Sequence, residues 1–196
     1  MVKKHNKTKL SNIDLTSKLS KAVLNLLKTK SWSEISVKSI CKKSSINRIE
    51  AYSIFKEKKD ILLIINNFFD QQMLSNMDMI EKTNKRDQIF EILMIRFDIL
   101  NQYRISIIKL YKYIIKKPDL ILFLFPSLIK SMNIILETSK ISSDGVFGNL
   151  KADILLLVYL ATLLVWLKDE NKDLEKTMVA LDSNLSKIDY IKKLIK

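Results

Sequence analysis

Few residues in this sequence are of the types that carry catalytic or metal-binding chemistry. The one histidine, His5, lies in a polar N-terminal tail, and the one cysteine is Cys41. A Ser-His-Asp triad, a multi-histidine metal site, a cysteine-based zinc cluster and an internal disulfide are therefore not expected. The two glycines are confined to DGVFG and cannot form a glycine-rich phosphate loop. We predict no catalytic residue, no metal and no cofactor, and we do not expect an enzyme.

The stretch SSINRIEAYSIFKEKKDIL, from Ser44 to Leu62, carries residues suited to binding rather than catalysis. A turn of small residues precedes a short segment with Arg48 and Tyr52, and a lysine-rich step follows. Residues 1–60 hold 15 Lys and Arg against 5 Asp and Glu, a net charge of 15 − 5 = +10 out of the chain's +13. This basic excess indicates an anionic partner for the N-terminal third, either nucleic acid or an acidic membrane surface.

The elements that would position these residues are helices. Only two glycines and two prolines interrupt 196 residues that are 47% hydrophobic and 28% charged, a composition that favours an all-α protein. Apolar periodicity predicts about nine helices. They are expected at about residues 14–30, 37–44, a short segment after Asn47, 58–80, 86–102, 104–117, 119–140, 149–168 and 171–190.

Capping signals fix several of these helix ends. Asp14 and Ser36 are expected to cap the first and second helices, and Asn47 the third, with Glu50 reaching back in a capping box. Ala51, Ile54 and Phe55 are expected to pack inward from the third helix, and Cys41 from the second. Pro118 is predicted in the first turn of helix 119–140, with a kink at Pro126.

The chain is predicted to have three parts: a disordered basic arm (1–12), a helix-turn-helix DNA-binding domain (13–60), and a helical ligand-binding and dimerisation domain (61–196). The longest apolar run, residues 154–167, is shorter than the roughly 20 residues that a bilayer span needs, so we predict a buried helix there. The N-terminus lacks the apolar run of a signal peptide, and a cytoplasmic location is expected.

The segment SWSEISVKSICKKSSINRIEAYSIFKEKKDIL resembles the DNA-binding part of the tetracycline-repressor (TetR) family of bacterial transcription regulators. It has that family's order of helix, aromatic link, capped helix, turn, tyrosine-bearing recognition helix and Lys-x-acid opening of a fourth helix. The resemblance implies that one set of side chains faces the major groove and another holds phosphates. The first set is Arg48, Ile49, Tyr52 and Ser53, and the second is Lys38, Tyr52 and Lys58.

The segment departs from the family pattern at four positions. Ser45 stands where a turn glycine is usual, Ile49 and Glu50 replace small or hydroxyl residues, and Ile54 replaces a frequent phosphate-binding histidine. A carboxylate at Glu50 serves the helix cap or, if it faced phosphates, would weaken DNA binding.

The C-terminal half carries a second resemblance. VWLKDENKDLEKTMVALD and its surroundings are similar to the lipid-binding accessory protein of coenzyme Q (ubiquinone) biosynthesis. That resemblance implies an alternative function, a membrane-associated lipid-binding protein with a vestigial helix-turn-helix. Segments that mix Ile and Leu with lysines, near residues 103–117 and 187–196, are consistent with peripheral membrane contact, although exposed lysines on packed helices are commoner.

Apolar residues in the C-terminal part are candidates for an effector pocket and for a dimer interface. Pocket candidates are Phe97, Tyr103, Leu110, Phe123, Met132, Tyr159 and Trp166, for each of which core packing is the alternative. Leu174, Met178, Leu181 and Leu185 form an apolar stripe at 3–4-residue spacing near the C-terminus. This stripe either attaches the last helix to its own chain or, as the resemblance implies, pairs it with a second copy across a two-fold axis. The interface candidates are Trp166, Leu174, Met178, Leu181 and Leu185.

The favoured function is therefore a TetR-type regulator, expected to act as a repressor. It would bind a palindromic operator in double-stranded DNA as a homodimer and be released by a small apolar or lipid effector.

Overall fold

The computed structural model describes residues 12–77 and 84–194, and these residues form nine α-helices and no strand. The predicted all-α class is thereby confirmed. The helices are α1 (Asn12–Leu27), α2 (Val37–Ser44), α3 (Arg48–Tyr52), α4 (Asp60–Leu74), α5 (Lys85–Gln102), α6 (Arg104–Ile114), α7 (Pro118–Thr138), α8 (Gly145–Trp166) and α9 (Glu175–Leu194). The predicted basic arm lies almost wholly outside the described residues, as does the end of the segment near residues 187–196.

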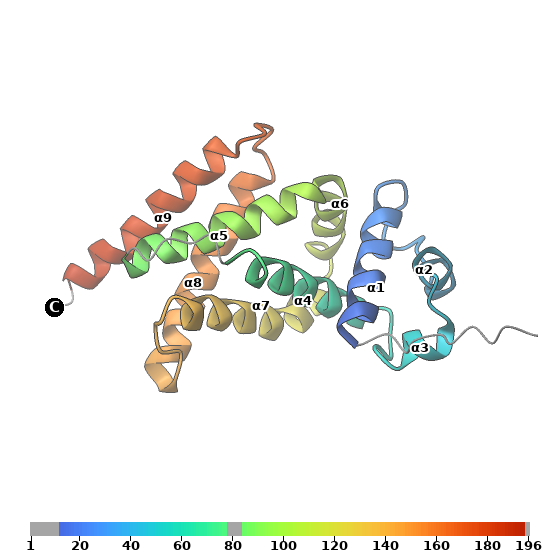
Figure 1. Cartoon of the computed structure of the whole chain (residues 1–196). Coiled ribbons are helices and arrows are strands. Elements are labelled where there is room, and N and C mark those ends of the chain that lie inside the picture. Colours follow the sequence, from blue (N-terminus) through green and yellow to red (C-terminus); the bar gives the residue numbers. More distant parts are fainter. Residues whose placement is uncertain (1–11, 78–83, 195–196) are drawn as a thin grey trace, which may run out of the picture.

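The first three helices, α1 to α3, form a compact unit at one end of the molecule (Figure 1). Helix α4 leads out of that unit and packs against α1, α5 and α7. Helix α6 also packs against α1, where Lys109 donates a hydrogen bond to the carbonyl of Lys28 at 2.9 Å and Ser106 donates to the carbonyl of Leu24. The small unit is thus attached to the larger one through both α4 and α6.

One continuous hydrophobic core runs from α1 to α9. It begins with Leu19 and Leu27 on α1 and ends with Leu181 and Leu185 on α9, all buried. The domain boundary predicted near residue 60 falls at the first residue of α4. Residues on both sides of this boundary belong to the same core, so the division into domains stays a prediction.

A buried polar cluster joins α4 to three other helices of the larger unit. Arg96 of α5 forms an ion pair with Asp70 of α4 and donates to Asn66 at 2.8 Å, while Ser131 of α7 donates to Asp70 at 2.8 Å. The guanidinium carbon of Arg96 lies 5.5 Å from the ring centroid of Tyr159 of α8. Burial acts to lower the pKa of Arg96, but Tyr159 and Asp70 outweigh it and the pKa is raised. Removing one partner of such a buried pair strongly destabilises a protein, because it leaves an uncompensated buried charge.

Several predicted helix ends need correction. Helix α1 begins at Asn12, so Asp14 lies in its first turn. Helix α4 ends at Leu74, earlier than the predicted end near residue 80. Pro118 occupies the first turn of α7 as predicted, and α7 continues through Pro126 as one helix.

The predicted buried helix at 154–167 is confirmed only in part, and the reason given for it was wrong. The helix that contains it, α8, has 22 residues. By length and composition alone, both α7 and the segment Gly148–Trp166 of α8 could cross a membrane. The length of the apolar run therefore excludes nothing. One side of α8 packs against α7 and α9, while Leu157 and Leu164 within the run are exposed, so the run is buried only in part.

Candidate nucleic-acid interface

Helix α2 and the turn after it are held by side-chain caps and one left-handed residue. Ser36 caps α2 as predicted, accepting a hydrogen bond from the Ser39 amide at 3.2 Å, and the Ser39 hydroxyl accepts from the Ser36 amide at 3.1 Å. The chain then reverses at Ser45, which has φ 57° and ψ 27°, and the Ser45 amide donates to the carbonyl of Cys41. This left-handed conformation suits glycine better than serine. Cys41 is buried, as predicted.

The cap of α3 accounts for the acidic residue in the candidate recognition helix. The Glu50 amide donates to Oδ1 of Asn47 at 2.9 Å, and the Asn47 amide donates to Oε2 of Glu50 at 3.2 Å. The predicted capping box is therefore present, and it confirms the structural role considered for Glu50. The carboxylate is directed at the backbone of its own helix, where its charge also complements the helix N-terminus.

Side chains predicted to read bases project from the outer face of α3. Ala51 and, just beyond the helix, Phe55 are buried, which anchors the inner face. Ile49 is 85% exposed and Tyr52 51%, while Arg48 is exposed and forms no hydrogen bond or ion pair within the described residues. The Tyr52 ring lies 5.7 Å from the Phe55 ring, which limits its freedom.

Ser53 and Lys58 are placed less favourably for binding DNA. The Ser53 hydroxyl donates to the carbonyl of Glu50 at 2.7 Å and is already satisfied within its own turn. The Lys58 ammonium donates to the carbonyl of Trp32 and lies 4.7 Å from the Trp32 ring centroid, and burial lowers the pKa of Lys58. In this structure Lys58 connects the start of α4 to the link after α1. Its ammonium is directed at Trp32, whereas the predicted phosphate contact would need it to point outward.

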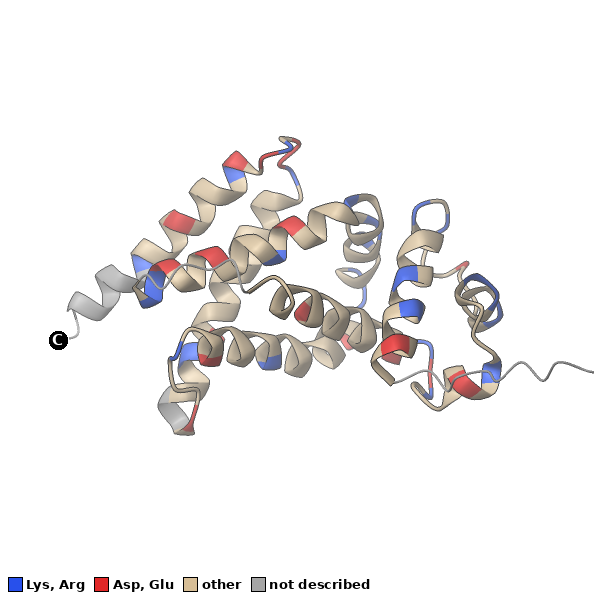
Figure 2. Ribbon diagram, in the orientation of Figure 1, with Lys and Arg blue, Asp and Glu red and all other residues tan. Residues whose placement is uncertain are grey.

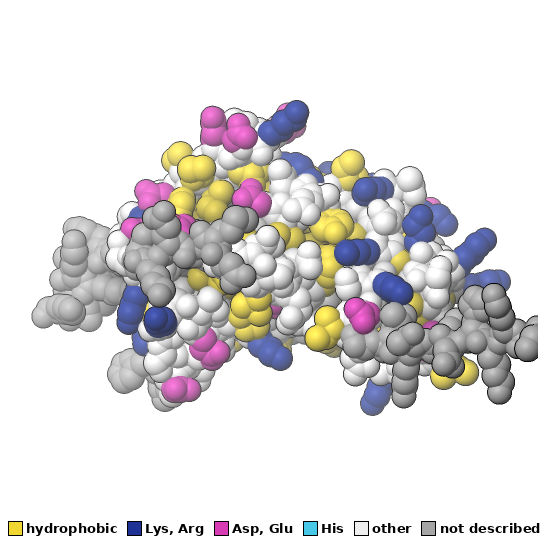
Figure 3. Space-filling view, in the orientation of Figure 1, with side chains coloured by type: hydrophobic (Ala, Val, Ile, Leu, Met, Phe, Trp, Pro, Cys, Tyr) yellow, Lys and Arg dark blue, Asp and Glu magenta, His cyan; other side chains and the backbone are white. Residues whose placement is uncertain are grey.

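Two lysines that were not predicted to bind DNA are also exposed on α2. Lys42 and Lys43 are exposed in the last turn of α2, immediately before the turn, and Lys38 is exposed in its first turn, as its predicted role requires. Figure 2 shows Lys and Arg on α1 and α2, and Figure 3 shows dark-blue side chains gathered on the half of the molecule that carries them. The pair of adjacent lysines before a small-residue turn is the sequence signal that would have identified Lys42 and Lys43.

The residues predicted to line an effector pocket lie mostly in the core. Most of the set is buried, and Phe97 and Tyr159 stack with ring centroids 5.4 Å apart. Tyr103 packs edge-on against Phe68 and Phe69, and Phe123 is half-buried. The buried members of the set are Phe97, Leu110, Met132, Tyr159 and Trp166. Effector binding by these residues stays a prediction.

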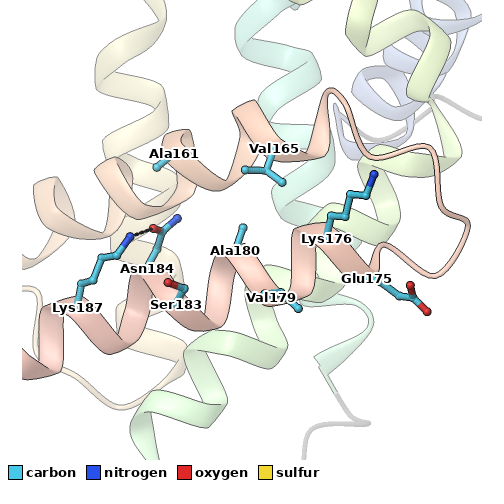
Figure 4. Close-up of a pocket in the computed structure, with 9 residues that line it drawn as sticks. All are labelled: Ala161, Val165, Glu175, Lys176, Val179, Ala180, Ser183, Asn184 and Lys187. Atoms are coloured by element: carbon cyan, nitrogen blue, oxygen red, sulfur yellow. Dashed lines mark hydrogen bonds between the residues drawn. The ribbon is translucent and has the colours of Figure 1, made fainter.

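Two surface hollows formed by described residues of the larger unit are lined by other side chains than these. One, of about 510 Å³, lies along α5 and includes Phe90, Met94 and Asp98. Partial burial raises the pKa of Asp98. The other, of about 680 Å³, is a groove between α8 and α9 (Figure 4), with Ala161 and Val165 on one side and Ala180 on the other.

The predicted interface residues are nearly all internal. Trp166, Leu174, Leu181 and Leu185 are buried within the chain, and only Met178, at 42%, is exposed. The alternative explanation of their stripe, attachment of α9 to its own chain, fits this burial. Among the described side chains, the other large apolar ones that face solvent on α8 and α9 were not predicted, and they are Leu150, Leu157, Leu164 and Val179.

Comparison with known proteins identifies the fold. No protein-family model matches the sequence, and no curated protein sequence matches it. Among solved structures, a TetR transcriptional regulator from Nitrosomonas europaea is similar with a TM-score of 0.71 and 16% identity, over 90% of this chain and 98% of that one. A TetR transcriptional regulator from Rhodococcus sp. RHA1 is similar with a TM-score of 0.55 and 14% identity, over 90% and 97% of the two chains.

The described residues therefore have the fold of TetR-type regulators, as the N-terminal resemblance implied. Both structural neighbours are transcriptional regulators, and neither bears on the resemblance to the accessory protein of ubiquinone biosynthesis, which stays a prediction.

Proposed function

We propose that this protein is a DNA-binding transcriptional regulator of the TetR type that represses transcription by binding a palindromic operator. The observation that carries the proposal is the outer face of α3, where Arg48, Ile49 and Tyr52 project from a helix whose inner face is anchored and whose only carboxylate is used in its cap. A helix with free, outward side chains after a tight turn can enter the major groove.

Within this proposal, Arg48 is the base reader. Its guanidinium has no partner within the described residues, and an arginine can bind the O6 and N7 atoms of guanine with two parallel hydrogen bonds. Ile49 would contact a thymine methyl group, and the Tyr52 hydroxyl a phosphate. Ser53 contributes little because its hydroxyl is already bonded.

Phosphate binding is assigned mainly to helix α2. Lys38, Lys42 and Lys43 are exposed there, and each would release counterions from the DNA on contact. For Lys58 we propose a positioning role. Its bond to the Trp32 carbonyl holds the entrance of α4 against the link after α1, and with it the orientation of the DNA-binding unit.

A second copy of the chain is required to present two recognition helices to a palindrome. We propose that it binds at the face formed by α8 and α9. Leu150, Leu157 and Leu164 are exposed on α8 at intervals of seven residues, so they form one stripe along the helix. The groove beside this stripe contains small side chains, including Ala161 and Ala180, which leave room for a ridge of side chains from the partner.

Release from DNA is proposed to follow binding of a small apolar effector among α5, α7 and α8, where the predicted pocket residues lie. An effector that bound better to an expanded packing of these helices would shift the population toward it. The buried cluster around Arg96 links α4 to α5, α7 and α8, and two hydrogen bonds link α6 to α1. Displacement of α4 and α6 would therefore reorient α1 to α3.

The proposal is tested by titrating the full chain with duplex DNA from upstream of its own gene at several salt concentrations. If several lysines contact phosphates, affinity falls by about three decades or more between ~50 and ~200 mM salt. Absence of binding at low salt would refute the proposal.

Variants then separate the proposed roles. Arg48→Ala is expected to reduce discrimination against the wrong base by about 1–3 kcal/mol, whereas Lys38→Ala is expected to weaken binding to all sequences and to reduce the salt dependence. Lys172→Ala, which removes an exposed lysine in the loop before α9, is the matched control and is expected to bind like the unaltered protein. Equal losses on all sequences for Arg48→Ala and Lys38→Ala would show that Arg48 does not read bases.

A further inference from the structure

The first half of α7 is an apolar helix that the rest of the chain leaves largely uncovered. An 18-residue window of the whole helix has a mean hydropathy of 1.7, yet only 22% of that window is buried, and four of the five buried residues of α7 lie in its second half. Leu122 is 74% exposed, Phe125 47% and Ile121 43%, and Ile115 at the end of α6 is 47% exposed. We call these four residues the α7 patch. Leu122 and Phe125 lie on the same side of the helix, since they are three residues apart.

The patch residues lie within a second basic segment of the chain, outside the helix-turn-helix. Residues 104–130 contain six Lys and Arg and one acidic residue, Asp119, a net charge of 6 − 1 = +5. Residues 61–196 carry a net charge of +3 in all, so the residues of this range outside 104–130 have a net charge of 3 − 5 = −2. The side chains of four lysines are exposed and form no hydrogen bond or ion pair within the described residues; these are Lys112, Lys116, Lys117 and Lys130. They are therefore free to meet an anionic partner.

We propose that the α7 patch and its lysines form a docking surface for an anionic lipid bilayer. An apolar helix face of Leu, Ile and Phe, flanked by lysines, matches what an interfacial helix presents to acidic headgroups. Leu122 and Phe125 would enter the acyl boundary, while lysines with long aliphatic stems would keep their charges at the headgroups. This surface is distinct from the α3 face and from the stripe on α8, and it does not depend on the function proposed above.

Two features favour a bilayer over other occupants. A second copy docking the same patch would bring two regions of +5 together, and like charges oppose such a contact. A peptide helix would need a groove for its apolar face. None of the four patch residues lines either of the two described hollows.

The test is co-sedimentation of the full chain with vesicles, comparing phosphatidylcholine alone with an equal mixture of phosphatidylcholine and phosphatidylglycerol. Binding is expected to the mixed vesicles only. Leu122→Glu should abolish it, whereas Ile105→Glu, which alters a comparably exposed side chain at the other end of α6, should leave it intact. Replacing Lys116 and Lys117 together by glutamine should lower affinity for the mixed vesicles roughly 20-fold or more, since each lysine near the surface contributes about fivefold.

Three outcomes would overturn the proposal. The first is equal binding by the Leu122→Glu and Ile105→Glu variants, and the second is an equal loss when Lys42 and Lys43 of α2 are replaced by glutamine. Either would mean that basic charge anywhere on the protein suffices. The third is a change of oligomeric state in Leu122→Glu without vesicles, measured by analytical ultracentrifugation, which would assign the patch to a second copy. A circular dichroism spectrum and thermal transition like those of the unaltered protein would show that Leu122→Glu still folds.

Discussion

At the residue scale, the turn between α2 and α3 is closed by a serine in a conformation that favours glycine. Ser45 has φ 57° and ψ 27°. A residue with a Cβ is destabilised by about 1–2 kcal/mol in the left-handed region, and glycine would relieve this strain. Part of the gain is offset because glycine also increases the conformational entropy of the unfolded chain. Ser45→Gly is therefore expected to raise the free energy of unfolding by about 0.5–1 kcal/mol, measured by urea denaturation.

Ser44→Gly is the matched control for this substitution. Ser44 is the last residue of α2, where glycine is expected to lower the free energy of unfolding by about 0.5–1 kcal/mol. Equal destabilisation by the two glycines would mean that Ser45 is not strained in solution.

Residue by residue, the sequence was most informative where an interaction is local. The caps at Ser36 and Asn47 were predictable because both partners of each lie three residues apart. The contact between Lys58 and Trp32 joins residues 26 positions apart, and no pattern in the intervening sequence indicates it. The same applies to the ion pair of Arg96 with Asp70, whose partners lie on different helices.

At the scale of the element, the start of α9 depends on one buried carboxylate. Asp169 accepts hydrogen bonds from the Thr177 amide and hydroxyl, each at 2.8 Å, and from the Asn171 amide at 3.2 Å. Burial acts to raise the pKa of Asp169, but these hydrogen bonds from Thr177 and Asn171 outweigh it and the pKa is lowered. The ionised form is therefore the one that stabilises the loop and the first turn of α9.

Asp169→Asn is expected to lower the free energy of unfolding at neutral pH by about 1–2 kcal/mol, because it weakens a buried cap. A folded-state pKa below that of the unfolded chain gives stability that is present above the ordinary aspartate pKa of about 4 and is lost as pH falls through the lower, folded-state value. The difference between the two proteins should thus shrink on acidification, as measured by urea denaturation over a pH series. Asp173→Asn, at an exposed position in the same loop, should have little effect, and a pH-independent difference for Asp169→Asn would argue against the ionised cap.

The positions of the helices were easier to predict than the surfaces against which they pack. The periodic apolar residues of α5 to α9 placed these helices to within a few residues, since a helix in a shared core must bury one side. Periodicity does not show which neighbour covers that side. The stripe of Leu174, Leu181 and Leu185 has the spacing of an interface but is buried within its own chain.

At the scale of the whole molecule, the proposed homodimer would depend on residues that lie outside the core. Nothing in the sequence separates Leu157, 67% exposed, from Leu156, 1% exposed, because adjacent residues of the apolar helix α8 look alike until its packing is known. The fold was predictable from local patterns and a resemblance, whereas the outward face of α8 emerged only once α7 and α9 were seen to cover its other sides.

The homodimer proposed above makes a prediction for this outward face. Leu157→Glu would place a carboxylate on the stripe of Leu150, Leu157 and Leu164, and two-fold symmetry would place it there twice. Each lost leucine contact removes about 1.5–3 kcal/mol, so dimerisation should weaken by about 3–6 kcal/mol, which is roughly 100-fold to 20,000-fold in the dissociation constant. Sedimentation equilibrium should then detect monomers at concentrations where the unaltered protein is dimeric.

Loss of the dimer should also change the preference for a whole palindrome over a half-site. A monomer presents one recognition helix, so Leu157→Glu is expected to bind half of a palindrome about as well as the whole, while the unaltered protein strongly prefers the whole site. Leu122→Glu, which adds the same charge at a similarly exposed leucine of α7, should stay dimeric and keep that preference. If Leu157→Glu remained a dimer with the same preference, the two copies would have to meet through another face, and the groove between α8 and α9 would be free for a different partner.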